Sequence, residues 1–76
     1  MSVKRDHEVQ NFVRHHRRLR DMTQQGLADR VSVTRQTVLS IERGRYNPSV
    51  GLALRLSGTL EVPVEALFRI EQEGRP

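Results

Sequence analysis

Apolar side chains recur through most of this chain at intervals of three and four residues, which is the period of an amphipathic helix. The pattern predicts five helices, over about residues 9–20, 24–31, 35–43, 50–60 and 63–68. No repeat or low-complexity segment separates them, so we expect one all-α domain over residues 9–68. A chain of 76 residues without cysteine buries only a modest core, and helix packing and dimerisation are its remaining sources of stability.

Helix start and stop signals agree with these limits. Thr23, Thr34 and Ser49 precede the second, third and fourth helices, where a hydroxyl accepts a hydrogen bond from a first-turn backbone N–H. Gly44 follows the third helix, as glycine commonly does at a helix end. Pro63 suits the first turn of the fifth helix, because its missing N–H would be unpaired there.

The two ends of the chain have different patterns. Residues 1–8 are polar and lack a period, which indicates a loose tail or a short strand. Residues 68–71 alternate apolar and polar side chains, so the C-terminal tail, residues 69–76, is compatible with a short strand as well. Residues 1–8 are then the candidate partner strand.

Residues 24–43 are predicted to form two helices joined by a tight bend. Ala28 is small enough for a close approach where the helices cross, and Val38 and Ile41 face the core. The opposite face of the second helix of this pair begins with polar side chains: Thr34, Arg35, Gln36 and Ser40. Arginine bonds guanine and glutamine bonds adenine through two hydrogen bonds each. This is the layout of a helix-turn-helix, whose second helix enters the major groove of DNA.

The basic charge is concentrated in the first two thirds of the chain. Residues 1–50 carry a net charge of +5 and residues 51–76 one of −1, which gives the overall +4. This distribution favours a polyanionic partner, here double-stranded DNA. No apolar run reaches membrane-spanning length and no secretory signal is present, so we expect a cytoplasmic protein that does not contact membranes.

Candidate residues for catalysis or metal binding are few. His15 and His16 are adjacent and do not share a helix face, so we expect neither a metal nor a cofactor, and a packed or pH-sensitive His16 is the alternative. No nucleophile has an orienting carboxylate and no glycine-rich phosphate loop occurs, so we expect no enzyme. Leu39 either touches a thymine methyl or only covers its helix, and Tyr46 is expected to pack in a loop.

The chain resembles the Cro/C1-type (XRE family) helix-turn-helix regulators in three stretches: TQQGLADRVSVTRQTVLSIERGRYNPS (23–49), LALRL (52–56) and VPVEALF (62–68). RQT followed by IERGRYNPS is especially similar to compact, stand-alone members. The likeness extends from Val9 to Phe68. It implies a lambda-repressor-like domain of five helices that binds DNA sequence-specifically and regulates transcription.

The resemblance also implies residue roles. Some side chains are implied to meet bases or nearby phosphates: Thr34, Arg35, Gln36 and Ser40. Others are implied to contact the DNA backbone: Gln24, Thr37, Arg43, Arg45 and Asn47. Gln24 additionally braces the recognition helix, and an ion pair between Arg17 and Glu42 ties the first helix to the end of the third.

Three positions depart from the family pattern. Ser32 stands where glycine is usual in the bend, and a non-glycine residue is strained there if φ is positive. His16 replaces a usual core leucine. Gly26 lies inside the second helix at a usually charged position, where it costs up to about 1 kcal/mol relative to alanine.

We expect a repressor that binds a two-fold operator as a homodimer, with no small-molecule effector evident. Compact relatives pair through the C-terminal region, where this chain has apolar residues: Val62, Val64, Leu67, Phe68 and Ile70. Two other functions use the same DNA-binding fold, namely the antitoxin of a toxin–antitoxin pair and a restriction–modification controller protein. RNA binding lacks support, because no paired exposed aromatic residues are present to stack bases.

Overall fold

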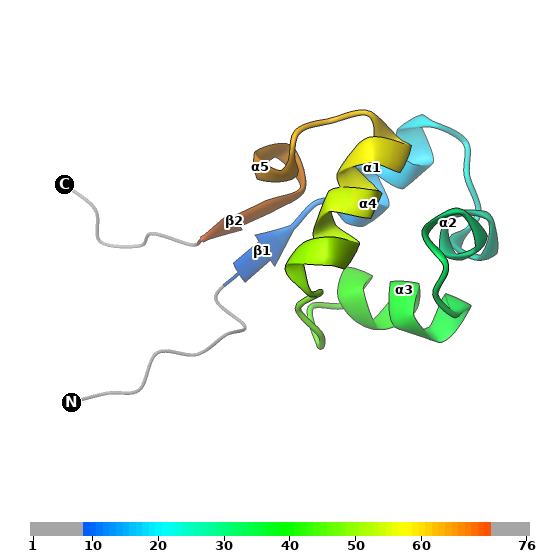
Figure 1. Ribbon diagram of the computed structural model, residues 1–76, viewed down its shortest axis with the longest axis horizontal. Coiled ribbons are helices and arrows are strands. Elements are labelled where there is room, and N and C mark those ends of the chain that lie inside the picture. Colours follow the sequence, from blue (N-terminus) through cyan, green and yellow to red (C-terminus); the bar gives the residue numbers. More distant parts are fainter. Residues whose placement is uncertain (1–8, 71–76) are drawn as a thin grey trace, which may run out of the picture.

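Five helices and a two-stranded antiparallel sheet make up the fold (Figure 1). The computed structural model describes residues 9–70. The elements in chain order are β1 (Val9–Asn11), α1 (Val13–Leu19), α2 (Gln24–Val31), α3 (Arg35–Glu42), α4 (Val50–Leu60), α5 (Val64–Leu67) and β2 (Phe68–Ile70). The prediction of five helices with short strands near the tails is therefore confirmed.

The sheet corrects the predicted start of the first helix. Val9 to Asn11 form β1, which pairs antiparallel with β2 so that Val9 lies opposite Ile70 and Asn11 opposite Phe68. The Phe12 backbone N–H donates to the Leu67 carbonyl at 2.8 Å, which extends the pairing up to the first turn of α1. Residues 9–11 fit a helical period, but their hydrogen bonds with β2 hold them in a strand. The predicted strand in residues 1–8 lies outside the described residues.

The helices surround one apolar core. Its buried members are Val13, Leu27, Ala28, Val31, Val38, Ile41, Leu52, Leu56, Leu60 and Leu67. Ala28 of α2 is fully buried, as its predicted place at the helix crossing requires. Leu19, the last residue of α1, is apolar but 67% exposed, because the helix ends there and the chain turns away at Arg20.

Hydroxyl caps begin three of the helices as predicted. Thr23 accepts from Gly26 N–H at 2.9 Å, and Thr34 and Ser49 cap α3 and α4 in the same way. The first cap also accounts for Gly26, because a Cβ at this position would lie only 3.1 Å from the Thr23 hydroxyl oxygen. Pro63 differs from expectation: its ψ of 156° is extended, so it is the N-cap of α5 and not a first-turn residue.

The bend between α2 and α3 depends on one residue in the left-handed region. Ser32 ends α2 with φ 63° and ψ 43°, and the chain then turns so that Val33 N–H donates to the Ala28 carbonyl at 3.0 Å. The Cβ of an L-residue crowds the backbone in this region, which costs about 1 kcal/mol. Gly44, after α3, also has a positive φ, and there glycine avoids this cost.

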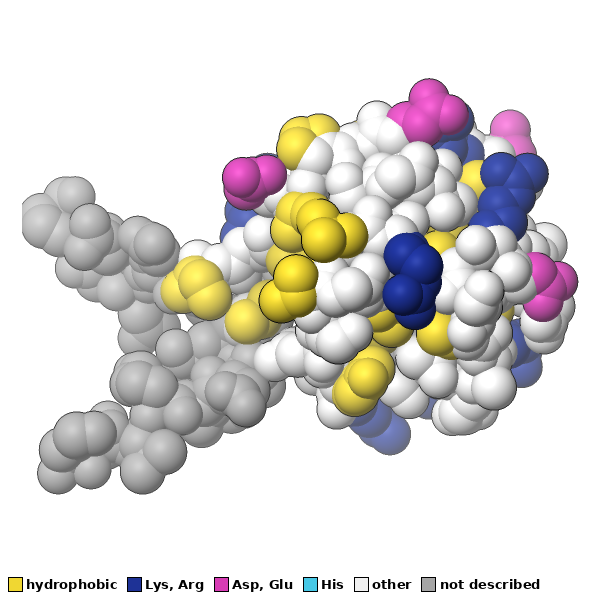
Figure 2. Space-filling model, in the orientation of Figure 1, with side chains coloured by type: hydrophobic (Ala, Val, Ile, Leu, Met, Phe, Trp, Pro, Cys, Tyr) yellow, Lys and Arg dark blue, Asp and Glu magenta, His cyan; other side chains and the backbone are white. Residues whose placement is uncertain are grey.

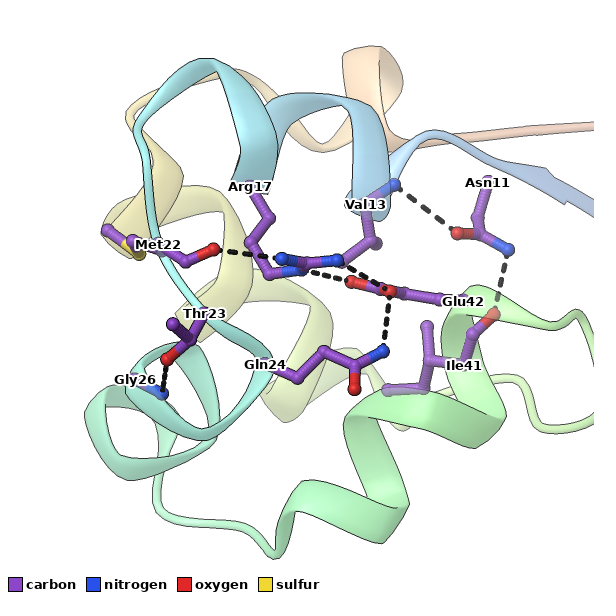
Figure 3. Close-up of polar contacts among 9 residues, drawn as sticks. All are labelled: Asn11, Val13, Arg17, Met22, Thr23, Gln24, Gly26, Ile41 and Glu42. Carbon is purple, nitrogen blue, oxygen red and sulfur yellow. Dashed lines mark hydrogen bonds and ion pairs between the residues drawn. The ribbon is translucent and has the colours of Figure 1, made fainter.

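Asn11 connects the sheet to two helices (Figure 3). Its Nδ2 donates to the Ile41 carbonyl near the C-terminal end of α3 at 2.8 Å. Its Oδ1 accepts from the Val13 N–H at the start of α1 at 3.3 Å. One side chain therefore pairs the Val13 N–H at the start of α1 and gives the Ile41 carbonyl, which also accepts from the Gly44 N–H, a second donor.

We predict that Ser32→Gly stabilises the fold by about 0.5–1 kcal/mol, because glycine removes the left-handed strain and the exposed serine side chain has no packing to lose. Urea unfolding monitored by circular dichroism measures this free energy. Ala53→Gly, inside α4, is the matched control and should destabilise by a similar amount. A loss of stability in both variants would contradict the assigned strain.

We predict that Asn11→Ala lowers the free energy of unfolding by about 1–2 kcal/mol, because the Val13 N–H loses its acceptor and the Ile41 carbonyl loses one of its two donors. The same urea titration measures the change. Gln10→Ala alters the neighbouring exposed residue of β1 and should stay within about 0.5 kcal/mol of the wild type. Equal effects of the two substitutions would show that the bridge contributes nothing.

Candidate nucleic-acid interface

A buried ion pair fixes the end of α3 against α1 (Figure 3). Arg17 Nε donates to Glu42 Oε2 at 2.7 Å, and Arg17 Nη2 donates to Glu42 Oε1 at 3.2 Å. Arg17 Nη1 donates to the Met22 carbonyl at 2.8 Å. The pair is two-pronged and almost fully buried, with side-chain exposures of 10% for Arg17 and 3% for Glu42. Such geometry strongly restricts the relative position of two helices.

Gln24 extends this network to α2. Its Nε2 donates to Glu42 Oε1 at 3.1 Å, so one carboxylate holds side chains from α1 and α2 together at the end of α3 (Figure 3). Gln24 is also the first residue of α2, where a backbone N–H has no acceptor inside the helix. The Gln24 side chain thus braces α3 from the start of α2.

The exposed face of α3 has two edges. Arg35 and Leu39 lie along one edge, and Arg35 is exposed to solvent. Gln36 and Ser40 lie along the other edge, beside a depression of about 270 Å³ that Arg45 and Tyr46 also line. The predicted base-reading residues therefore share the outward side of α3 but are divided between its two edges.

The hydroxyl groups near the start of α3 also hold the helix together. Thr34 Oγ1 accepts from the Thr37 N–H at 3.2 Å and lies 3.1 Å from the Thr37 hydroxyl. Ser40 is half-buried, whereas Arg35 and Gln36 are exposed. The two long side chains are thus the groups best placed to reach beyond the helix surface.

A hollow of about 590 Å³ lies between α1, the start of α2 and α3. It is lined by Arg14, Arg17, Arg18, Thr23, Gln24, Gln25, Arg35, Leu39, Glu42 and Arg43. The only acidic side chain in this lining is Glu42, which Arg17 neutralises. Arg14 and Arg18 were not predicted from the sequence to belong to the interface. Their i, i+4 spacing on the outer side of α1 is the signal that identifies them.

The residues predicted to form the homodimer interface differ in their exposure to solvent. Val62, Val64 and Phe68 are half-buried, and Ile70 is 60% exposed. Leu67 was expected at this surface, but its side chain is fully buried in the core, so it is not available to a partner. Figure 2 shows hydrophobic side chains gathered on the side of the molecule where α4, α5 and β2 lie.

Two findings concern residues 9–70 as a whole. Within this range, no three histidine, cysteine or acidic side chains come together in a way that would hold a metal ion. None of the helices α1 to α5 has the length and apolar character to cross a membrane.

Comparison with known proteins agrees with this geometry. Residues 13–67 match the helix-turn-helix family. An uncharacterized HTH-type transcriptional regulator of Methanothermobacter thermautotrophicus is 40% identical over 67 residues, covering 87% of this chain and 97% of the relative. One from Methanocaldococcus jannaschii is 35% identical over 65 residues, covering 86% and 98%. A Bacillus subtilis regulator is 42% identical over 52 residues, covering 68% and 79%. The chain therefore belongs to the Cro/C1-type (XRE) family of helix-turn-helix, DNA-binding transcriptional regulators.

Proposed function

We propose that the protein is a repressor that binds a two-fold operator as a homodimer, with α3 in the major groove. The observation that carries this proposal is the contrast between the two sides of α3. Val38 and Ile41 are buried and Glu42 is bonded to two other helices, so the helix is rigidly held. Arg35 and Gln36 stand exposed at its start, which is the end that meets base edges in helix-turn-helix complexes.

Each reading residue has a chemical preference. We assign Arg35 to a guanine, through O6 and N7, and Gln36 to an adenine, through N6 and N7. Thr34 and Ser40 flank these two residues. Their side chains are shorter, and we assign their hydroxyl groups to bases or to the nearest phosphates. Because Arg35 and Gln36 lie on different edges of α3, we expect them to read different base pairs.

Other residues are assigned to the DNA backbone, where they set the orientation without reading sequence. They are Gln24, Thr37, Arg43, Arg45 and Asn47. Gln24 supports this role through its position at the start of α2, where the helix dipole and an unpaired N–H favour a phosphate. Arg43 and Arg45 are exposed just beyond α3 and add positive charge at its other end.

Pairing of two copies follows from the size of the site. One module buries little DNA-facing surface, and two modules on half-sites one helical turn apart multiply affinity and specificity. We assign the pairing surface to Val62, Val64, Phe68 and Ile70, which are apolar and at least partly accessible. A dimer on promoter DNA blocks access by occupancy alone, which is sufficient for repression.

We predict that Arg35→Ala and Gln36→Ala each cost about 1–3 kcal/mol on the operator and relax specificity at one base pair. The operator is first selected from a random DNA pool, and binding of single-base variants is then measured by fluorescence anisotropy. If both variants bound operator and random DNA like the wild type, the assignment of α3 as recognition helix would fail.

Arg43→Ala and Arg45→Ala provide the contrasting pair for this experiment. They should weaken binding to all sequences alike and make the salt dependence of affinity shallower, because they remove backbone contacts only. Loss of discrimination at one base pair in these variants would instead place them among the base-reading residues.

We predict that the wild type sediments as a dimer at micromolar concentration and that Ile70→Asp sediments as a monomer, because a carboxylate in an apolar interface is left unpaired. Val50→Asp is the matched control: Val50 is 76% exposed at the start of α4, where an acidic residue is tolerated. A monomeric wild type, with and without DNA, would count against the homodimer.

A further inference from the structure

We propose that α1 is a second phosphate-binding element, in which Arg14 and Arg18 bind the sugar–phosphate backbone that passes over the hollow beside α3. This inference rests on the proposed DNA binding and extends it to a helix that has no assigned contact with DNA. The ligand class is a polyanionic strand, held by charge and without reading of sequence.

The local geometry of α1 divides its arginines into two groups. Arg17 points inward and is bonded to Glu42 and to the Met22 carbonyl. Arg14 and Arg18 are one helical turn apart, exposed, and line the hollow. Neither has a hydrogen bond or ion pair with any described residue, so both guanidinium groups are available to a ligand. Helix α1 therefore carries two unneutralised charges beside Arg17, and all three arginines line the hollow.

The hollow places these charges beside the recognition helix. Arg35 and Arg43 line it from α3, at opposite ends of that helix, and Gln24 lines it from the start of α2. Because Glu42 is neutralised within the brace, the unpaired charges around the hollow are all positive. A DNA strand whose bases meet Arg35 has its phosphates alongside α3, and the hollow is the surface that these phosphates would face.

The shape of the hollow favours a strand over a small anion. It is an open depression whose lining comes from three helices, and its arginines are spread along it. Each phosphate neutralised by an arginine releases condensed counterions, so each contact contributes to the salt dependence of binding. Arg14 and Arg18 would thus supply affinity for any duplex.

The test uses the full chain, a short duplex of mixed sequence and the selected operator, with affinity measured across a salt series. Arg14→Ala and Arg18→Ala should each make the slope of log K against log salt shallower by about 0.9, on both duplexes alike. Arg14→Lys and Arg18→Lys retain the charge and should keep the slope close to the wild-type value. Thermal unfolding should be unchanged in all four variants, because neither side chain has a partner to lose.

Arg30→Ala is the matched control, since it removes one exposed arginine that does not line the hollow. Arg30 lies about 140° around α2 from Gln25, which does line it, given about 100° per residue. The slope of log K against log salt for Arg30→Ala should stay at the wild-type value. If Arg14→Ala and Arg18→Ala also keep that value, or if Arg30→Ala falls equally, the assignment of α1 is overturned.

Failure of this inference is distinguishable from failure of the proposed function. If Arg35→Ala and Gln36→Ala lose base discrimination while the α1 variants keep the wild-type slope, α3 reads DNA and α1 does not contact it. If the wild type itself shows no salt-dependent binding to either duplex, both are overturned together. If inorganic phosphate at millimolar concentration competes with the duplex only when Arg14 and Arg18 are present, the hollow is a small-anion site, which also overturns the proposal.

Discussion

The bond network around Glu42 is the constraint on which the orientation of α3 depends. One carboxylate accepts hydrogen bonds from Arg17 of α1 and Gln24 of α2, and both oxygens are used. Burial of the two charges is acceptable only because they are paired, and an unpaired one costs about 3–5 kcal/mol. Apolar packing through Val38 and Ile41 attaches α3 to the core. The ion pair between Arg17 and Glu42 also fixes the orientation of α3 relative to α1, because a contact through two hydrogen bonds allows little rotation.

Features that depend on neighbouring residues could be predicted from the sequence. The helix periods and the three hydroxyl caps are local, and the structure has all of them. The strand β1 could not be predicted, because its residues fit a helical period and form a strand only through pairing with β2, at the other end of the chain. Burial of Leu67 depends on how α5 docks, which no local pattern specifies.

The same distinction applies to the candidate site. Exposure of Arg35 and Gln36 followed from the helical period once Val38 and Ile41 were placed inside. The shared use of Glu42 by two helices needed the tertiary arrangement, as did the hollow that brings α1 beside α3. Arg14 and Arg18 could not be assigned from the sequence, because only the folded arrangement places them around the same hollow as Arg35.

The bridge made by Asn11 has a consequence for anything attached near the ends of this chain. The amide spans the short distance from β1 to the last turn of α3, and β1 is itself paired to β2. Both strands of the sheet are therefore coupled to the C-terminal end of α3 through the Asn11 side chain. A tag, fusion partner or bound protein that pulls on either strand would therefore act on the position of α3, so the sheet offers an input for engineered control of any ligand that this helix binds.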